Sequence, residues 1–312
     1  MMRKIKKPSV DVVIPTYERP KEHDQQNYML QDALESVLEQ TYPVNDIFVV
    51  IDGKSLISKK IVTNFHDNRI KVIESVEKKG GGSARNLGIR ASNSDFIAFL
   101  DDDDLWIKDK IEKQIKSLSC YSSYDLVFSF SQVKSEKKGI HGVLPKNSFK
   151  EGWSFAEYIF LHNGYITTST IMASRALLQE NMFTERLPKH QDWDWLFKAN
   201  FFFDVKAIYV AEPLTVYRTK YIGRSMSVSN RNLWHFSYSW IRTYGKYLNK
   251  QVIARFDRDN VITGILDDRH MTKSQKTSAL HNIFLDLSFT EKMGDLFKCA
   301  RHIIRIQLNR LL

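Results

Sequence analysis

The sequence is poor in cysteine and has no long apolar run. Two cysteines, Cys120 and Cys299, occur in 312 residues. That is too few for a disulfide framework or paired zinc knuckles, so a reducing compartment is expected. No stretch reaches the roughly 18 uninterrupted apolar residues that a membrane-spanning helix needs. The basic start lacks the apolar region of a signal peptide, since Asp11 and Pro15 interrupt it. We expect a cytoplasmic protein, either soluble or peripheral on the inner face of the cytoplasmic membrane.

An acidic excess is also absent, and the charge is unevenly distributed. The formal net charge is +10, yet residues 1–212 hold 29 basic and 29 acidic side chains, whereas residues 213–312 hold 17 and 7. A basic tail on a neutral body indicates an anionic partner surface, either lipid headgroups or nucleic acid. Apolar residues make up 43% of the chain, which argues against disorder and allows one large α/β domain with an appendage, or two domains.

Strand and helix patterns alternate through the first hundred residues. Short apolar runs predict strands at 10–15, 47–52, 70–74 and 95–100. This alternation predicts an α/β fold with a mostly parallel central sheet and helices on both faces. We expect the catalytic domain at 1–228 and a mainly helical, basic region at 229–312. The polar segment 134–152 is interpreted as a mobile loop and a candidate lid.

Polar residues follow three of the predicted strands. Thr16 and Tyr17 come after the first strand, Asp52 after the second, and Asp101–Asp104 after the fourth. Ligands of such sheets bind at the carboxyl ends of the strands, so these residues are expected at one edge. Tyr17 could stack on a planar base or simply pack. Asp52 could accept from a base N–H or cap a turn.

The stretch FIAFLDDDDLW places four carboxylates directly behind the fourth strand. Like charges this close resist ionising together unless a cation lies among them. Mg²⁺ and Mn²⁺ prefer carboxylate and phosphate oxygens, so an Asp-x-Asp at a strand end can hold such an ion against a nucleotide diphosphate. The alternative is an ordinary solvated turn or helix cap, because Asp favours helix starts.

Two further stretches carry candidate chemistry. In KKGGGSARNLGI, three glycines free the backbone to approach a ligand, and Arg85 suits a phosphate or a base edge. The alternative is a flexible turn before an amphipathic helix. In PKHQDWDWLFKA, tryptophans surround Asp192 and Asp194 and could raise a carboxyl pKa toward the range of a general base. The alternative there is an amphipathic helix start.

In combination and order, these elements resemble the family 2 glycosyltransferases, inverting enzymes of the GT-A fold that use nucleotide sugars. The resemblance covers about residues 10–227 and rests on the following elements, in family order: Pro15-Thr16-Tyr17-Glu18-Arg19, Asp52, Gly80 to Gly88, Leu100 to Trp106, Gln191 to Leu196, and Tyr217-Arg218 with Ser225-Met226-Ser227.

The resemblance implies a role for each matched position. Asp192 would be the base that deprotonates the acceptor hydroxyl, and Asp103 would ligate Mn²⁺ or Mg²⁺. The residues implied in binding the nucleotide sugar are Pro15, Thr16, Tyr17, Glu18, Asp52, Arg85, Asp101 and Asp102. Two positions depart from the family pattern: Glu18, where Asn is frequent, and Gln191, where Glu is frequent.

The predicted function is metal-dependent transfer of one sugar, from a UDP-sugar by family resemblance, to a hydroxyl of a glycan acceptor. The last residues, 296–312, show the pattern of an interfacial helix on anionic lipid, or of a helix packed on protein. Lipid binding would fit an acceptor on a polyprenyl diphosphate, as in surface-polysaccharide assembly, and no nucleic-acid partner is expected. The alternative is a basic nucleic-acid- or lipid-binding protein with a non-catalytic GT-A domain. A phosphatase with Asp-x-Asp after a strand fits less well, because Asp103 is followed by Asp104-Leu105 and not by the Thr or Val that such enzymes carry. A nucleotidyltransferase fits less well, because Pro-Thr-Tyr stands after the first strand in place of a glycine-rich signature.

Overall fold

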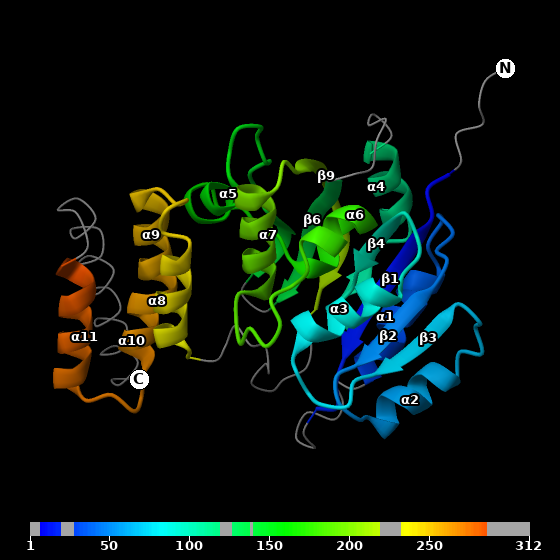
Figure 1. Cartoon of the computed structure of the whole chain (residues 1–312), viewed down its shortest axis with the longest axis horizontal. Helices are drawn as coiled ribbons and strands as arrows, with labels where there is room; N and C mark the ends of the chain where they lie inside the picture. The colour runs from blue at the N-terminus through cyan, green and yellow to red at the C-terminus, as the bar shows by residue number, and fades with distance from the viewer. Residues whose placement is uncertain (1–6, 20–27, 119–126, 138–139, 219–231, 286–312) are drawn as a thin grey trace. The chain divides into compact units, whose positions relative to one another are not determined.

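The computed structural model describes residues 7–19, 28–118, 127–137, 140–218 and 232–285. The chain divides into two compact units, Met1–Met226 and Ser227–Leu312 (Figure 1). The first unit is an α/β domain, as the sequence predicts. Its described strands form one nine-stranded sheet in the order β3-β2-β1-β4-β8-β6-β9-β5, with β7 paired to β6.

The first four strands of the chain form the parallel part of this sheet. They are β1 (Val10–Thr16), β2 (Ile47–Ile51), β3 (Ile70–Glu74) and β4 (Phe96–Phe99). All four lie within two residues of their predicted bounds. β1, β2 and β4 are buried along their whole length, as apolar runs of this kind suit parallel strands, whereas β3 is largely exposed. β1 pairs with both β2 and β4. The carboxyl ends of these three strands therefore meet at one edge.

The remaining strands make the sheet mixed rather than mostly parallel. They are β5 (Leu105–Trp106), β6 (Val127–Lys137), β7 (Ile140–Leu144), β8 (Met172–Ser174) and β9 (Lys206–Tyr217). β8 is antiparallel to both β4 and β6, whereas β6 and β9 are parallel. The prediction of a loop at 134–152 is wrong for residues 134–137 and 140–144, which are strand. β6 and β7 pair there as an antiparallel hairpin, with Val133 opposite Leu144, so backbone hydrogen bonds order this polar stretch.

Helices cover both faces of the sheet (Figure 1). The helices of the first unit are α1 (Met29–Leu38), α2 (Leu56–Thr63), α3 (Gly81–Ala91), α4 (Lys110–Leu118), α5 (Phe155–Leu161), the 3₁₀ turn η2 (Thr168–Thr170), α6 (Arg175–Glu180) and α7 (Gln191–Phe202). Apolar residues of α1, α2 and α4 share one core with the Val12 and Ile14 side of β1. α3 packs on the opposite side, where a Cβ on Gly88 would lie 2.5 Å from a Val13 methyl carbon. Glycine at this position lets the helix approach the strand closely.

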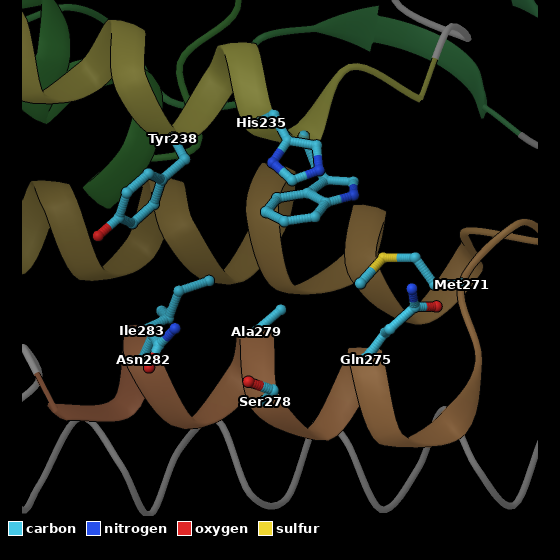
Figure 2. Close-up of a pocket in the computed structure, with 9 residues that line it drawn as sticks. His235, Tyr238, Met271, Gln275, Ser278, Ala279, Asn282 and Ile283 are labelled. Atoms are coloured by element: carbon cyan, nitrogen blue, oxygen red, sulfur yellow. The ribbon is translucent and has the colours of Figure 1, made fainter.

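The second unit is helical in its described part, as the sequence predicts. It contains α8 (Trp234–Thr243), α9 (Lys250–Phe256), the π-helical η4 (Asp257–Ile262), α10 (Thr263–Asp267) and α11 (Lys273–Leu285). A pocket of about 600 Å³ lies between α8 and α11, lined by Trp234 and Tyr238 on one side and Gln275 and Asn282 on the other (Figure 2). In the described part of the chain, no helix is both long and apolar enough to cross a membrane. The interfacial helix expected at 296–312 lies outside the described residues.

Candidate active site

The residues predicted after three strand ends meet at one edge of the sheet. The backbone N–H of Asp52, after β2, donates to the carbonyl of Thr16 at the end of β1, at 2.7 Å. Asp101 to Asp104 follow β4, which pairs with the other side of β1. The structure thus brings three separate sequence elements to a single edge, as predicted. Pro15 lies within β1 itself, and the side chain of Glu18 is exposed to solvent.

Asp102 is held from within the protein. Its two carboxylate oxygens accept from the Arg19 guanidinium at 2.9 and 2.6 Å, and one also accepts from the Thr16 hydroxyl at 2.5 Å. Both side chains of the ion pair are buried. These contacts give Thr16 and Asp102, two predicted nucleotide-binding residues, an evident structural role. They fix the shape of the acidic loop. Binding of a nucleotide by these two side chains stays a prediction.

Asp52 organises the glycine-rich turn before α3. Its carboxylate oxygens accept from the backbone N–H groups of Lys79 and Gly80, each at 2.7 Å. Nearby, the Lys78 ammonium lies 4.0 Å from the centre of the Tyr17 ring, and the Arg19 guanidinium lies 4.9 Å from it. The tyrosine is therefore part of a positively charged surface, which suits the phosphates of a nucleotide as well as its base.

Arg85 connects the acidic loop to α7. One terminal nitrogen contacts the carboxylate of Asp101, and the other donates to the side-chain oxygen of Gln191 at 3.3 Å. The guanidinium also lies 5.4 Å from the ring centre of Phe183. The glycine run leaves room for this bridge: a Cβ on Gly81 would lie 3.1 Å from Arg85 Nη1 and 3.3 Å from Gln191 Oε1. Arg85 and Gln191, which are 106 residues apart in sequence, are thereby joined.

Asp103 and Asp104 lie at the centre of the negative charge. Burial, with the charges of Asp102 and Asp101, raises the pKa of Asp103 to about 7. One oxygen of Asp104 accepts from the Ser169 hydroxyl at 2.6 Å, and the other is buried without a hydrogen-bond partner. This crowding of carboxylates would be relieved by a cation.

Asp192 is the second residue of α7, at the positive end of the helix. One of its oxygens accepts from the N–H of Trp193 at 3.1 Å. Burial raises the pKa of Asp192 to about 6, against the opposing effects of that N–H and of the Arg85 charge. A pKa in this range suits a general base.

Asp194, the other acidic candidate, is engaged in packing contacts. It accepts from the Thr184 hydroxyl at 2.6 Å and lies 3.5 Å from the Lys198 ammonium. Trp195 is fully buried, and its indole N–H donates to the carbonyl of Asn181. Its side chain is therefore part of the hydrophobic core and is not exposed for stacking on a ligand. The geometry therefore favours Asp192 over Asp194 as the base.

Three further residues belong to the site: sequence reasoning missed Ser169 and Tyr165, and it gave the matched Tyr217 no role. Ser169 bridges the acidic loop, since its hydroxyl donates to Asp104 and accepts from the backbone N–H of Asp101 at 3.1 Å. Burial and the neighbouring acidic groups raise the pKa of Tyr217 to about 12, and raise that of Tyr165 as well. The charges acting on both tyrosines include Asp104 and Asp192, so both lie near the acidic loop and the start of α7. Tyr217 lies in the matched Tyr-Arg element, whereas no sequence signal marks Ser169 or Tyr165.

Comparison with known proteins identifies the class. The family "Glycosyl transferase family 2" matches residues 11–184. The chain is 32% identical over 217 residues to the amylovoran biosynthesis glycosyltransferase AmsB of Erwinia amylovora, covering 67% of this chain and 69% of that protein. It is 33% identical over 124 residues to WfgD of Escherichia coli, a UDP-Glc:alpha-D-GlcNAc-diphosphoundecaprenol beta-1,3-glucosyltransferase, covering 38% of this chain and 46% of WfgD.

The fold has counterparts among solved structures. S. aureus TarS (residues 1–349), in complex with UDP-GlcNAc, matches with a TM-score of 0.58 and 16% identity, covering 91% of this chain and 77% of that one. The chain belongs to glycosyl transferase family 2 and is a glycosyltransferase. AmsB is named for amylovoran biosynthesis and WfgD for a sugar on diphosphoundecaprenol. The predicted α/β fold of the GT-A type is confirmed.

Proposed function

We propose that the protein is an inverting, divalent-cation-dependent glycosyltransferase that moves one sugar from a UDP-sugar to a hydroxyl of a lipid-linked glycan. One observation carries the proposal: the Arg85 bridge sets the acidic loop, where a donor diphosphate would bind, next to the start of α7. The partly buried carboxylate of Asp192 lies in the first turn of α7. A donor site and a base at one edge are the two parts that a single displacement requires.

The donor would lie along the carboxyl ends of β1, β2 and β4. Tyr17 and Asp52 would contact the base, and Asp101 and Arg85 would lie on the ribose and diphosphate side. The N-terminus of α3 and the lysines at 78 and 79 add positive charge for the phosphates. UDP is favoured because TarS, which shares the fold, binds UDP-GlcNAc and WfgD is named for UDP-Glc.

The acidic loop fits a hard divalent cation. Asp103 would be the protein ligand, and the unpartnered buried oxygen of Asp104 offers a further acceptor for the water shell of an ion. Among the described residues, no group of three His, Cys, Asp or Glu side chains is arranged to hold a metal by itself. Mg²⁺ and Mn²⁺ commonly bind through one or two carboxylates plus substrate phosphates. When bound, the ion would neutralise charge developing on the leaving diphosphate.

Asp192 would take the proton of the acceptor hydroxyl as that oxygen attacks the anomeric carbon. Attack from the face opposite the leaving group inverts the anomeric configuration in one step. Asp192 must be ionised to accept the proton. Since its pKa is raised to about 6, activity should rise as the pH increases through that value. Tyr165 and Tyr217, which lie near the acidic loop and the start of α7, would line the space for the acceptor.

The acceptor is proposed from the relatives. WfgD is named for a sugar carried on diphosphoundecaprenol, and AmsB for the polysaccharide amylovoran. An acceptor of this kind would be met at the cytoplasmic face of a membrane. The excess of basic residues in 213–312 would favour attraction to anionic lipid there.

A panel of UDP-, GDP- and dTDP-sugars tests the function. Each is incubated with and without Mn²⁺ and with a polyprenyl-diphosphate-linked glycan, and released nucleotide and product mass are measured. We expect release with UDP-sugars that depends on the cation and on the acceptor. Asp192→Asn should strongly reduce transfer while retaining donor binding, whereas Asp204→Asn, which changes an exposed residue beyond α7, should leave transfer unchanged. Salt-sensitive binding of single-stranded DNA without nucleotide release would instead support the non-catalytic alternative.

A further inference from the structure

The side chain of Gln191 is held at both ends of its amide. Its oxygen accepts from Arg85 Nη1 at 3.3 Å, and its nitrogen donates to the carbonyl of Leu187 at 2.8 Å. The amide lies over the glycine run before α3, where a Cβ on Gly81 or Gly82 would come within 3.3 and 3.7 Å of its oxygen. Gln191 is therefore a fixed part of the site, and it immediately precedes Asp192.

The Arg85 guanidinium is paired with a carboxylate on one side only. The guanidinium is buried, and it contacts one carboxylate, that of Asp101, whose side chain is 33% exposed. Its Nε is buried without a hydrogen-bond partner. On the other side it meets the neutral amide of Gln191. A charge in a buried setting acts strongly on its neighbours, so Arg85 favours the ionised form of a nearby carboxyl.

We propose that Gln191 is a positioning residue, whose neutral amide holds the Arg85 guanidinium beside Asp192 without cancelling its charge and so keeps that carboxylate ready to accept a proton. The inference rests on the proposed function for the role of Asp192, and it adds what sets the working pH range of that base. A carboxylate in place of the amide would make the same hydrogen bond while neutralising Arg85.

The ionisable groups whose charge acts on Asp192, or that its charge acts on, come from four elements. They are Arg85 of α3, Asp101 of the acidic loop, Tyr165 before η2, and Tyr217 at the end of β9. Burial raises the pKa of Asp192, the Trp193 N–H and the Arg85 charge lower it, and Asp101 raises it. Arg85 is the one cation in this set of four, so a change in its compensation should be felt directly at Asp192.

Gln191→Glu is the test, because it preserves side-chain shape and the acceptor for Arg85 and adds one negative charge, although it gives up the hydrogen bond to the Leu187 carbonyl. The acid limb of kcat/KM against pH should move upward by about one pH unit, since a like charge close to a carboxyl raises its pKa. Gln179→Glu makes the same substitution at an exposed position of α6 and should leave the limb in place. The carboxyl carbon of Asp192, assigned by NMR with the Asp192→Asn variant, should titrate with the same upward shift.

The possible results separate the two proposals. Coinciding pH profiles and coinciding NMR titrations for wild type and Gln191→Glu would overturn the inference. If the wild-type protein releases no nucleotide from any donor, the proposed function fails. The NMR titration still reports whether Arg85 acts on Asp192 through this contact. Gln191→Met, which keeps the volume but loses the hydrogen bond to Arg85, should lower kcat more than it changes KM for the donor.

Discussion

Replacing Arg19 with methionine would test whether its buried ion pair with Asp102 stabilises the acidic loop and the folded domain. The side chains of Arg19 and Asp102 are 5% and 7% exposed, and two guanidinium nitrogens bond the two carboxylate oxygens. Methionine fills much of the same volume but leaves a charged carboxylate buried with the Thr16 hydroxyl still donating to it. Removing one partner of such a pair costs about 3–5 kcal/mol, a large part of the about 5–15 kcal/mol by which domains are stable.

Urea unfolding, followed by tryptophan fluorescence, measures this loss in Arg19→Met, Asp102→Asn and the double variant. The double variant should recover most of the stability lost in Arg19→Met, because replacing both partners leaves no unpaired charge. Arg90→Met is the matched control. Arg90 pairs with Glu185 on the surface, at 51% and 42% exposure, and such a pair contributes about 0–1 kcal/mol. A loss below about 1 kcal/mol for Arg19→Met, or a double variant no more stable than it, would refute the reasoning.

Three further substitutions probe the base, the helix–sheet contact and the cation. Asp192→Asn should lower kcat by about 10²–10⁴-fold. Because the folded-state pKa of Asp192 is raised, the native state binds more protons between pH 3.8 and about 6, so the variant should gain stability relative to wild type as pH rises through that window, measured by urea unfolding. Gly88→Ala places a Cβ 2.5 and 2.6 Å from the Val13 methyl carbons and should destabilise by about 1–3 kcal/mol, an effect that Val13→Ala should reduce. Asp103→Asn should raise the Mn²⁺ concentration needed for half-maximal activity, measured by Mn²⁺ titration, and an unchanged requirement would contradict its assignment as the ligand.

Much of the site's location could be predicted from the sequence. Apolar runs of strand length end at Thr16, Asp52 and Asp101, and parallel strands bring their carboxyl ends to one edge. Local periodicity is sufficient for this step, because each strand's pattern is contained in five or six neighbouring residues. The hairpin of β6 and β7 escaped prediction for the same reason. Residues 134–137 of β6 are polar and β7 mixes polar with apolar residues, and their order comes from pairing with each other and with β9.

The roles of neighbouring acidic residues depended on contacts that no local pattern shows. Asp101 to Asp104 are alike in sequence, yet Asp101 meets Arg85, Asp102 meets Arg19, and Asp104 meets Ser169. The glycine run suggested room for a ligand, but side chains from Arg85 and Gln191 occupy part of the space that a Cβ would fill.

The sequence by itself determined the alternation of strands and helices, the edge at which polar residues gather and the carboxylates available there. Tertiary structure decided which of those carboxylates are bonded within the protein and which remain available to a ligand. The physical reason is separation along the chain. The partners of Asp102 lie 83 and 86 residues away, and those of Arg85 lie 16 and 106 residues away. Such pairings arise only when the sheet and its covering helices bring distant segments into contact.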